Sequence, residues 1–246
     1  MSRYPLLAEQ SHRPWEIPQS PWLMEQSWHD LLFMHWSFPP ETIQALLPAG
    51  ITLDTFDGRA WLGVVPFHMS HITVRSIPVL PSFPELNVRT YVTVDCKPGV
   101  WFFSLDAANR LAVEGARLLF HLPYFKADMK VGFEGDTSHY TSRRTDRRIG
   151  TGELRLRYRP TAPAYHSQPG SLDAWLTERY CLYAAKNGAI YRGNIHHLPW
   201  SLQPAEAEIE VNTVTQAHQL MLPDVPPLLH YAKRLDVLAW YLERVM

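Results

Sequence analysis

The stretch FPELNVRTYVTV, residues 83–94, has the two-residue period of an extended strand. Its alternate residues form one apolar face, Leu86, Val88, Thr90, Val92 and Val94, and one polar face, Glu85, Asn87, Arg89 and Tyr91. The polar face is either an ordinary solvent-exposed surface or the lining of a pocket. The segment VWFFSLDA at 100–107 is strongly aromatic and is predicted to be the neighbouring strand, which favours burial on both faces. An enclosed carboxylate there needs a partner.

The composition describes a folded chain rather than a disordered one. The 246 residues are 46% hydrophobic and 19% charged, and they include 21 prolines against 12 glycines. Proline interrupts helices and central strands, so we expect many short elements joined by long loops. No repeat or linker divides the chain, so we predict a single domain over residues 1–246, with residues 1–26 as an extended N-terminal arm. The fold class is mainly β with a few short helices, most consistent with a barrel or strongly curved sheet.

Turn signals and periodicity locate further elements. Asp57-Gly58 and Asn187-Gly188 predict two hairpins, and strands are expected to follow one another from residue 83 to residue 125. Ser171 is expected to cap a short helix. The tail LLHYAKRLDVLAWYLERV, residues 228–245, fits a strand and a helical stripe equally well.

Charge and cysteine content limit the partners. The formal net charge is −1, which provides no overall field to attract nucleic acid or an anionic membrane. The basic run RRTDRR at 143–148 contains an acid and precedes two glycines, which is typical of a solvated loop. Two isolated cysteines, no signal peptide and no long apolar run favour a cytoplasmic protein. A homo-oligomer remains open.

No motif in the sequence identifies a cofactor or a metal. The histidines are densest at His68, His71, His196 and His197, but no HExxH motif, cysteine pair or carboxylate cluster accompanies them. Nucleotide-binding glycine loops and a GxSxG nucleophile motif are also missing from the sequence. We therefore expect no metal and no cofactor. Lys126 and Lys130 are four residues apart, so they are either two solvent-exposed amines or a pair in which one pKa is lowered toward a nucleophilic form.

Five segments in order, FPELNVRTYV, GVWFFSLDA, ARLLFHLPYFKA, LTERYCLY and IHHLPW, resemble the YqjF-like family of bacterial proteins of unknown function. That family is related to acetoacetate decarboxylase, and the resemblance extends from about Trp22 to Trp240. It implies a mainly β, cone-shaped barrel that encloses a small cavity, with the C-terminal segment as a strand. It also implies that the polar face of residues 83–94 lines the cavity.

The same resemblance implies that the parent reaction has been lost. Acetoacetate decarboxylase forms a Schiff base on a lysine in a run that ends Tyr-Pro-Lys-Lys, whereas this chain has ARLLFHLPYF. Aligning Arg117 and Pro123 with that run puts Tyr124 and Phe125 in place of the two lysines and leaves Lys126 one position beyond. Neither Tyr nor Phe can form an iminium with a ketone. Glu85 matches an acid of the decarboxylase, whereas His29 and Trp61 stand where it has an arginine and a glutamate.

These observations lead to three functional hypotheses. The first is a protein that binds a small, partly polar organic molecule in a barrel cavity; its candidate ligand-binding residues are Glu85, Asn87, Arg89, Tyr91, Tyr124, His29, His121 and Trp61. The second is a lyase or decarboxylase that uses Lys126 as a shifted Schiff-base nucleophile. The third is an interaction or structural protein with a vestigial pocket.

Overall fold

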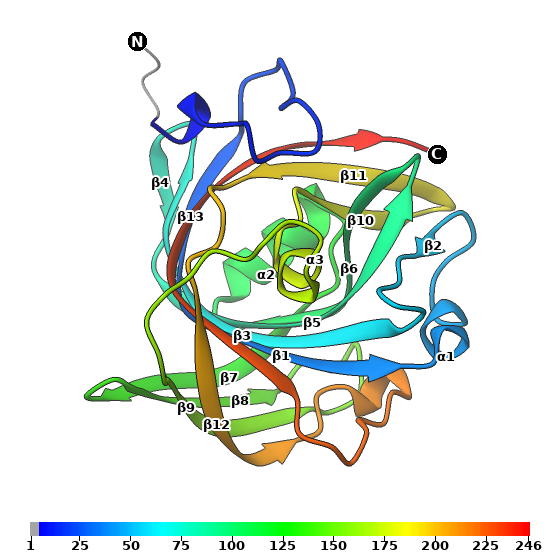
Figure 1. Ribbon diagram of the computed structural model, residues 1–246. Helices are drawn as coiled ribbons and strands as arrows, with labels where there is room; N and C mark the ends of the chain where they lie inside the picture. Colours follow the sequence, from blue (N-terminus) through cyan, green and yellow to red (C-terminus); the bar gives the residue numbers. More distant parts are fainter. Residues whose placement is uncertain (1–4) are drawn as a thin grey trace.

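A computed structural model describes residues 5–246, which form a curved sheet with three short α-helices (Figure 1). The first strands in the described region are β1 Met24–Phe38, β2 Thr52–Leu53, β3 Ala60–Val74, β4 Ile77–Leu80, β5 Phe83–Val94, β6 Lys97–Ala107 and β7 Tyr124–Glu134. The others are β8 Thr137–Arg144, β9 Glu153–Pro160, β10 Cys181–Lys186, β11 Ala189–His196, β12 Leu202–Asn212 and β13 Leu228–Arg244. The helices are α1 Pro40–Gln44, α2 Arg110–Leu119 and α3 Leu172–Thr177, with 3-10 turns η1 Pro5–Ala8 and η2 Gln216–His218. None of the helices in residues 5–246 has the length and apolar character needed to cross a membrane.

Part of the sheet closes on itself. Strands β11, β10, β6, β5, β3, β1 and β13 pair in that order, and β13 pairs again with β11, so these strands form a ring. The predicted mainly β fold is confirmed. The tail of the chain is the long strand β13, which pairs with β1, β11 and β12, so the strand assignment of the ambiguous C-terminal segment is also confirmed.

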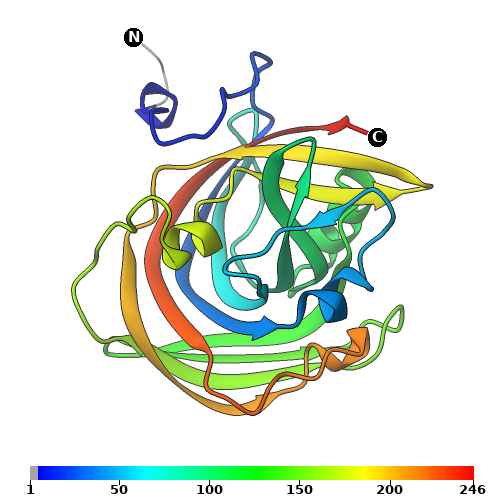
Figure 2. The same cartoon turned by 45° about the vertical axis from the view of Figure 1, so that its right-hand side comes forward.

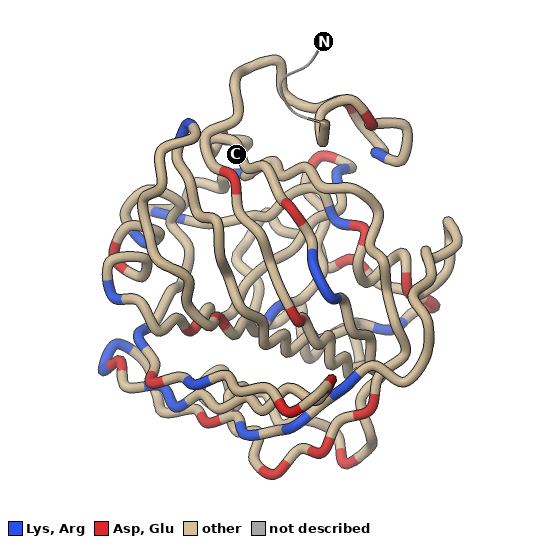
Figure 3. The backbone as a smooth tube through the Cα atoms, turned by 90° about the vertical axis from the view of Figure 1, so that its left-hand side faces the viewer, with Lys and Arg blue, Asp and Glu red and all other residues tan. Residues whose placement is uncertain are grey.

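A second layer leaves the ring at β6 and returns to it at β13. It consists of β7, β8, β9 and β12, and its inner side chains, including Tyr140 and Leu156, pack against Leu86 and Val88 of β5. Leu86 and Val88 of the apolar face are therefore buried between the ring and this layer, whereas Val92 and Val94 pack in a separate cluster with Cys181 and Tyr183. Glu85, Asn87 and Arg89 of the polar face point into the ring. Figure 3 shows acidic and basic residues alternating along the outer strands, where Arg157 of β9 pairs with Glu208 of β12.

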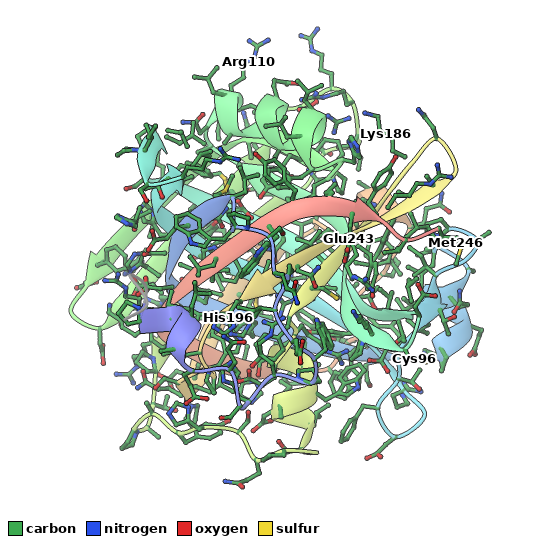
Figure 4. All side chains as sticks on the ribbon, turned by 90° about the horizontal axis from the view of Figure 1, so that it is seen from above. Cys96, Arg110, Lys186, His196, Glu243 and Met246 are labelled. Carbon is green, nitrogen blue, oxygen red and sulfur yellow. The ribbon has the colours of Figure 1, made fainter. Side chains whose placement is uncertain are left out.

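Two short helices lie at opposite ends of the ring (Figures 2 and 4). Helix α3 begins where predicted, because the Ser171 hydroxyl accepts a hydrogen bond from the backbone N–H of Ala174. Helix α2 contradicts the expectation of continuous strands up to residue 125. The Asn109 side chain accepts from the backbone N–H of Ala112 and caps this helix in the same way.

Other local expectations were met in part. Asn187 and Gly188 both have positive φ and join β10 to β11 in the predicted hairpin. Asp57 and Gly58 also turn the chain with positive φ, but they do not join two paired strands, because β2 pairs with β5 rather than with β3.

Within the predicted N-terminal arm (residues 1–26), residues 5–23 extend over the outside of the ring. The first four residues of the arm lie outside the described part of the chain, and β1 begins two residues before the predicted end of the arm. Arg13 Nη1 donates to the carbonyl of Ile195 over 2.7 Å, and the indole of Trp240 donates to the carbonyl of Ser20 over 2.7 Å. The arm is thus attached to β11 and β13.

Candidate functional site

The ring encloses a cavity of about 390 Å³. Glu85, Asn87 and Arg89 of β5 line it, together with Tyr124 of β7, so four of the predicted wall residues lie on one cavity. Nearly all the remaining lining is apolar, contributed by β1, β3, β6 and α2, with residues such as Leu31, Phe67, Leu105 and Ala116. Ligand pockets of this kind, apolar with a few convergent polar groups, typically have volumes of roughly 300–1,000 Å³.

Glu85 is held in the apolar wall by a single side chain. The Tyr124 hydroxyl donates to Glu85 Oε2 over 3.0 Å, and Glu85 is 2% exposed. Burial raises the pKa of the Glu85 carboxyl to about 8, against the smaller opposing effect of the Tyr124 hydrogen bond. The carboxyl is therefore mainly protonated and neutral at pH 7, and it can donate as well as accept a hydrogen bond.

Arg89 lies farther along the same face and is not paired with Glu85. Four residues of extended strand separate their Cα atoms by roughly 13 Å. Arg89 Nη2 makes two long hydrogen bonds, of 3.4 Å to the Tyr91 hydroxyl and 3.5 Å to the Leu176 carbonyl, and Nε has no partner within residues 5–246. The Glu85 and Arg89 side chains therefore share no hydrogen-bond partner among the described residues. Instead the guanidinium lies 5.1 Å from the ring centre of Phe33.

A second arginine closes the cavity beside α3. Arg179 follows this helix, and its Nη1 forms a 2.6 Å ion pair with Asp54, while its Nε donates to the Trp175 carbonyl over 2.6 Å. Burial lowers the pKa of Arg179, and the Asp54 carboxylate opposes that shift. Sequence reasoning missed this residue, although it directly follows the predicted helix. Its charge, unlike that of Arg89, is compensated within the protein.

The opposite end of the cavity opens toward α2. Leu111 and Leu119 of this helix line the cavity and are nevertheless 76% and 65% exposed, and Val79 of β4 is 45% exposed. The lining residues at the α3 end are buried, among them Arg89 and Thr177. The cavity therefore has a buried cationic end at α3 and an exposed apolar mouth at α2.

Tyr91, the fourth residue of the polar face, lies behind the cavity wall. Its hydroxyl is 2.6 Å from Nε2 of His35, a fully buried histidine whose pKa burial lowers well below its usual value, with Arg89 adding to the shift. His35, Gly63 and Arg89 occupy one row across β1, β3 and β5. A Cβ at Gly63 would lie 3.2 Å from the His35 ring and 3.3 Å from Arg89 Cγ, so glycine makes room for both side chains.

The other predicted wall residues lie outside the set that lines the cavity. His29 is on the outer side of β1, where its Nε2 is 2.7 Å from the Ser70 hydroxyl. His121 packs edge-on against Tyr191 with its Nδ1 3.4 Å from Lys186 Nζ. Trp61 packs beside Tyr91 in a separate apolar cluster.

Lys126 is also outside the cavity. Its Nζ donates to the Ala127 carbonyl over 2.9 Å and lies 3.8 Å from Asp128, and its side chain is one third exposed. The other four lysines, Lys97, Lys130, Lys186 and Lys233, are likewise not among the lining residues. Among residues 5–246, no group of three or more His, Cys, Asp or Glu side chains is arranged to hold a metal ion.

Several solved structures share this fold, among them an acetoacetate decarboxylase and an acetoacetate decarboxylase-like enzyme. The acetoacetate decarboxylase of Legionella pneumophila superimposes with a TM-score of 0.59 at 14% identity, over 98% of this chain and 95% of that one. An acetoacetate decarboxylase-like enzyme from Sphingomonas wittichii RW1 gives 0.60 at 13% identity, over 92% and 94%. The enduracididine biosynthesis enzyme MppR, complexed with pyruvate, gives 0.63 at 9% identity, over 92% and 91%. These likenesses establish the fold alone: the ring and its outer layer form an acetoacetate-decarboxylase-like fold.

Sequence comparison gives the family. Residues 25–236 match DUF2071, a family described as an uncharacterised conserved protein. The uncharacterised protein YqjF of Bacillus subtilis (strain 168) is 49% identical over 231 residues, which is 93% of this chain and 95% of that protein. The chain belongs to this family.

Proposed function

We propose that this protein binds a small, partly polar organic molecule in the cavity inside the ring. One observation carries the proposal: Glu85, Asn87 and Arg89 follow one another along β5 on the buried wall of a cavity whose lining is mostly apolar. The Asn87 Oδ1 and Arg89 Nε atoms are buried without a partner among the described residues. Buried polar atoms are nearly always hydrogen-bonded, so these two are suited to a guest.

The fold supports the same conclusion. MppR has been solved with pyruvate, with a condensation product of pyruvate and imidazole 4-carboxaldehyde, and with HEPES buffer, so a cavity in this fold accommodates small organic molecules. Identity to those chains is low, so the nature of the guest must be inferred from the residues of this chain.

We infer further that the protein does not act through a Schiff base. A nucleophilic amine must reach the substrate, and Lys126 Nζ is directed to a backbone carbonyl outside the cavity. A lyase that uses Lys126 is thus the weaker alternative. A structural protein with a vestigial pocket is the other, and it predicts that the cavity takes up no guest.

The cavity can be tested with a neutral fluorescent probe of matching size, 1-naphthylamine. We expect saturable, one-to-one fluorescence enhancement with the wild-type protein and a clear loss in Ala116→Trp, which places an indole on the lining face of α2. The matched control, Arg110→Trp, adds the same indole on the exposed side of that helix and should bind the probe like wild type (Figure 4). Absence of saturable binding, or equal binding by both variants, would contradict the proposal.

A further inference from the structure

The buried end of the cavity carries a positive charge that the protein leaves uncompensated. Arg89 is 8% exposed, and within residues 5–246 it forms no ion pair with a carboxylate. A buried charge is costly unless it is paired and well hydrogen-bonded. Arg144, another buried arginine, shows the usual solution, because its Nε lies 2.7 Å from Asp106. Arg89 differs from it in facing a cavity.

Neighbouring groups do not supply the missing anion. Glu85 is neutral near pH 7 because burial raises its pKa to about 8. Asp54 is already bound to Arg179 at 2.6 Å. His35 lies beside Arg89 and can only add positive charge. The anion that balances Arg89 must therefore come from outside the protein. A carboxylate accepts two parallel hydrogen bonds from a guanidinium, and the adjacent Asn87 amide offers a further polar contact.

The lining of the rest of the cavity indicates that the anionic group is attached to an apolar chain. From Arg89 toward α2 the lining is almost wholly aliphatic and aromatic, and the mouth is bordered by Leu111, Leu119 and Val79. One water molecule occupies about 30 Å³ in the liquid, and we take the same volume for each non-hydrogen atom of a guest. A cavity of about 390 Å³ then holds on the order of a dozen non-hydrogen atoms. A saturated ten-carbon carboxylate has that size.

We propose that the cavity binds a medium-chain aliphatic monocarboxylate, with its carboxylate at Arg89 and its chain directed toward the mouth at α2. This inference rests on the proposed function and specifies the chemical class of the guest. The guest enters between α2 and β4 with its carboxylate leading, so the carboxylate comes to lie at the buried end and the chain occupies the mouth behind it. A long apolar mouth and one buried cation without a counter-charge together disfavour compact, strongly polar guests.

The test compares three guests of equal length by calorimetry at pH 7: decanoate, decanol and decylamine. We expect wild type to prefer decanoate to decanol by roughly 10- to 100-fold, the range of a charge-assisted hydrogen-bonded contact of about 1.5–3 kcal/mol. Arg89→Met should remove that preference and leave decanol binding within a few-fold. Arg89→Lys should restore part of it. Arg110→Met, which removes an exposed charge from α2, is the control and should change neither affinity.

The outcomes separate this inference from the proposed function. Equal binding of decanoate and decanol by wild type would overturn the carboxylate assignment while leaving a cavity that binds organic molecules. Decylamine binding more tightly than decanoate would overturn it in the same way. If wild type binds none of the three but binds the naphthylamine probe, the inference fails alone. If wild type binds neither the three guests nor the probe, the inference and the proposed function both fail. The comparison of decanoate, decanol and decylamine uses only the wild-type protein. The inference can therefore be tested even if Arg89→Met folds poorly.

Discussion

Tyr124 of β7 and Glu85 of β5 form a direct side-chain hydrogen bond in the cavity wall, a 3.0 Å contact from the phenol hydroxyl to Oε2. Tyr124 stands where the resemblance places a decarboxylase lysine, so an amine position is occupied by a phenol. Burial raises the pKa of Tyr124 well above its usual value, and the neighbouring Glu85 adds to that shift. The pair therefore stays neutral near pH 7 and provides hydrogen bonds without charge in the middle of an apolar wall.

The protonation of Glu85 gives a pH-dependent stability. Its pKa is about 8 when folded against an ordinary value of 4.5, so between these values the folded state keeps a proton that the unfolded chain releases. This contribution is fully present below about pH 4.5 and is lost as the pH rises through 8. We compare the free energy of unfolding of Glu85→Gln with that of wild type by urea unfolding. As the pH rises from 5 to 8.5, we expect the difference to move by about 3–5 kcal/mol in favour of the variant. Glu16→Gln, in the exposed part of the arm, is the control. A pH-independent difference for Glu85→Gln would show that the carboxyl is ionised in the fold.

Arg89 tests whether the two ionisable lining residues of β5 act as a pair. A buried ion pair loses about 3–5 kcal/mol when one partner is removed. Because Arg89 has no carboxylate partner in the described chain, we expect Arg89→Met to be neutral or stabilising in the ligand-free protein at pH 7. The double variant with Glu85→Gln should be additive within roughly 0.5 kcal/mol. A large, strongly coupled loss would mean that the two side chains do interact.

The Asp106–Arg144 pair provides the opposite case. Arg144 Nε lies 2.7 Å from Asp106 Oδ1, and the two side chains are 0% and 1% exposed. Asp106→Asn leaves a buried guanidinium without its counter-charge, so we expect a loss of about 3–5 kcal/mol in the free energy of unfolding. Glu208→Gln breaks the exposed pair with Arg157 and should cost no more than about 1 kcal/mol. Similar losses in the two variants would be incompatible with the burial described.

Lys126 allows a chemical test. Incubation with acetoacetate and borohydride should leave the mass of the protein unchanged, because the amine is directed away from the cavity and toward the Ala127 carbonyl. A Schiff-base amine must also be neutral near pH 7, which requires its pKa to fall by roughly three units. A trapped adduct that disappears in Lys126→Ala but persists in Lys130→Ala would instead support the lyase alternative.

The alternation of residues 83–94 made much of the site predictable. Period two fixes which residues share a face, so Glu85, Asn87 and Arg89 had to lie together once the strand was assigned. Which face was enclosed depended on the outer layer formed by β7, β8, β9 and β12, and local sequence does not contain that information. Helix α2 was expected to be part of a run of strands. The spacing of its apolar residues, which Arg110, Glu114 and Arg117 interrupt, and the Asn109 cap were the signals that decide for a helix.

His29 shows why position in an alignment did not predict orientation. The pairing of β1 with β3 shifts between His29 and Met34, and Asp30 has a φ of 51°. A one-residue irregularity moves a side chain to the other face of a strand. His29 therefore faces outward, while His35, beyond the shift, lies next to Arg89. Such a bulge depends on tertiary pairing and has no clear sequence signature here.

A crystal structure of the protein with decanoate is the most direct test of the account, which holds that the charge on Arg89 is balanced by a bound carboxylate. We predict a continuous chain of density running from the α2 mouth, past Glu85, to the buried end. Its carboxylate oxygens should lie within roughly 2.7–2.9 Å of the Arg89 guanidinium nitrogens. A ligand with its carboxylate at the α2 mouth would contradict the account. So would a cavity that holds only water, in crystals of a protein that binds decanoate in solution.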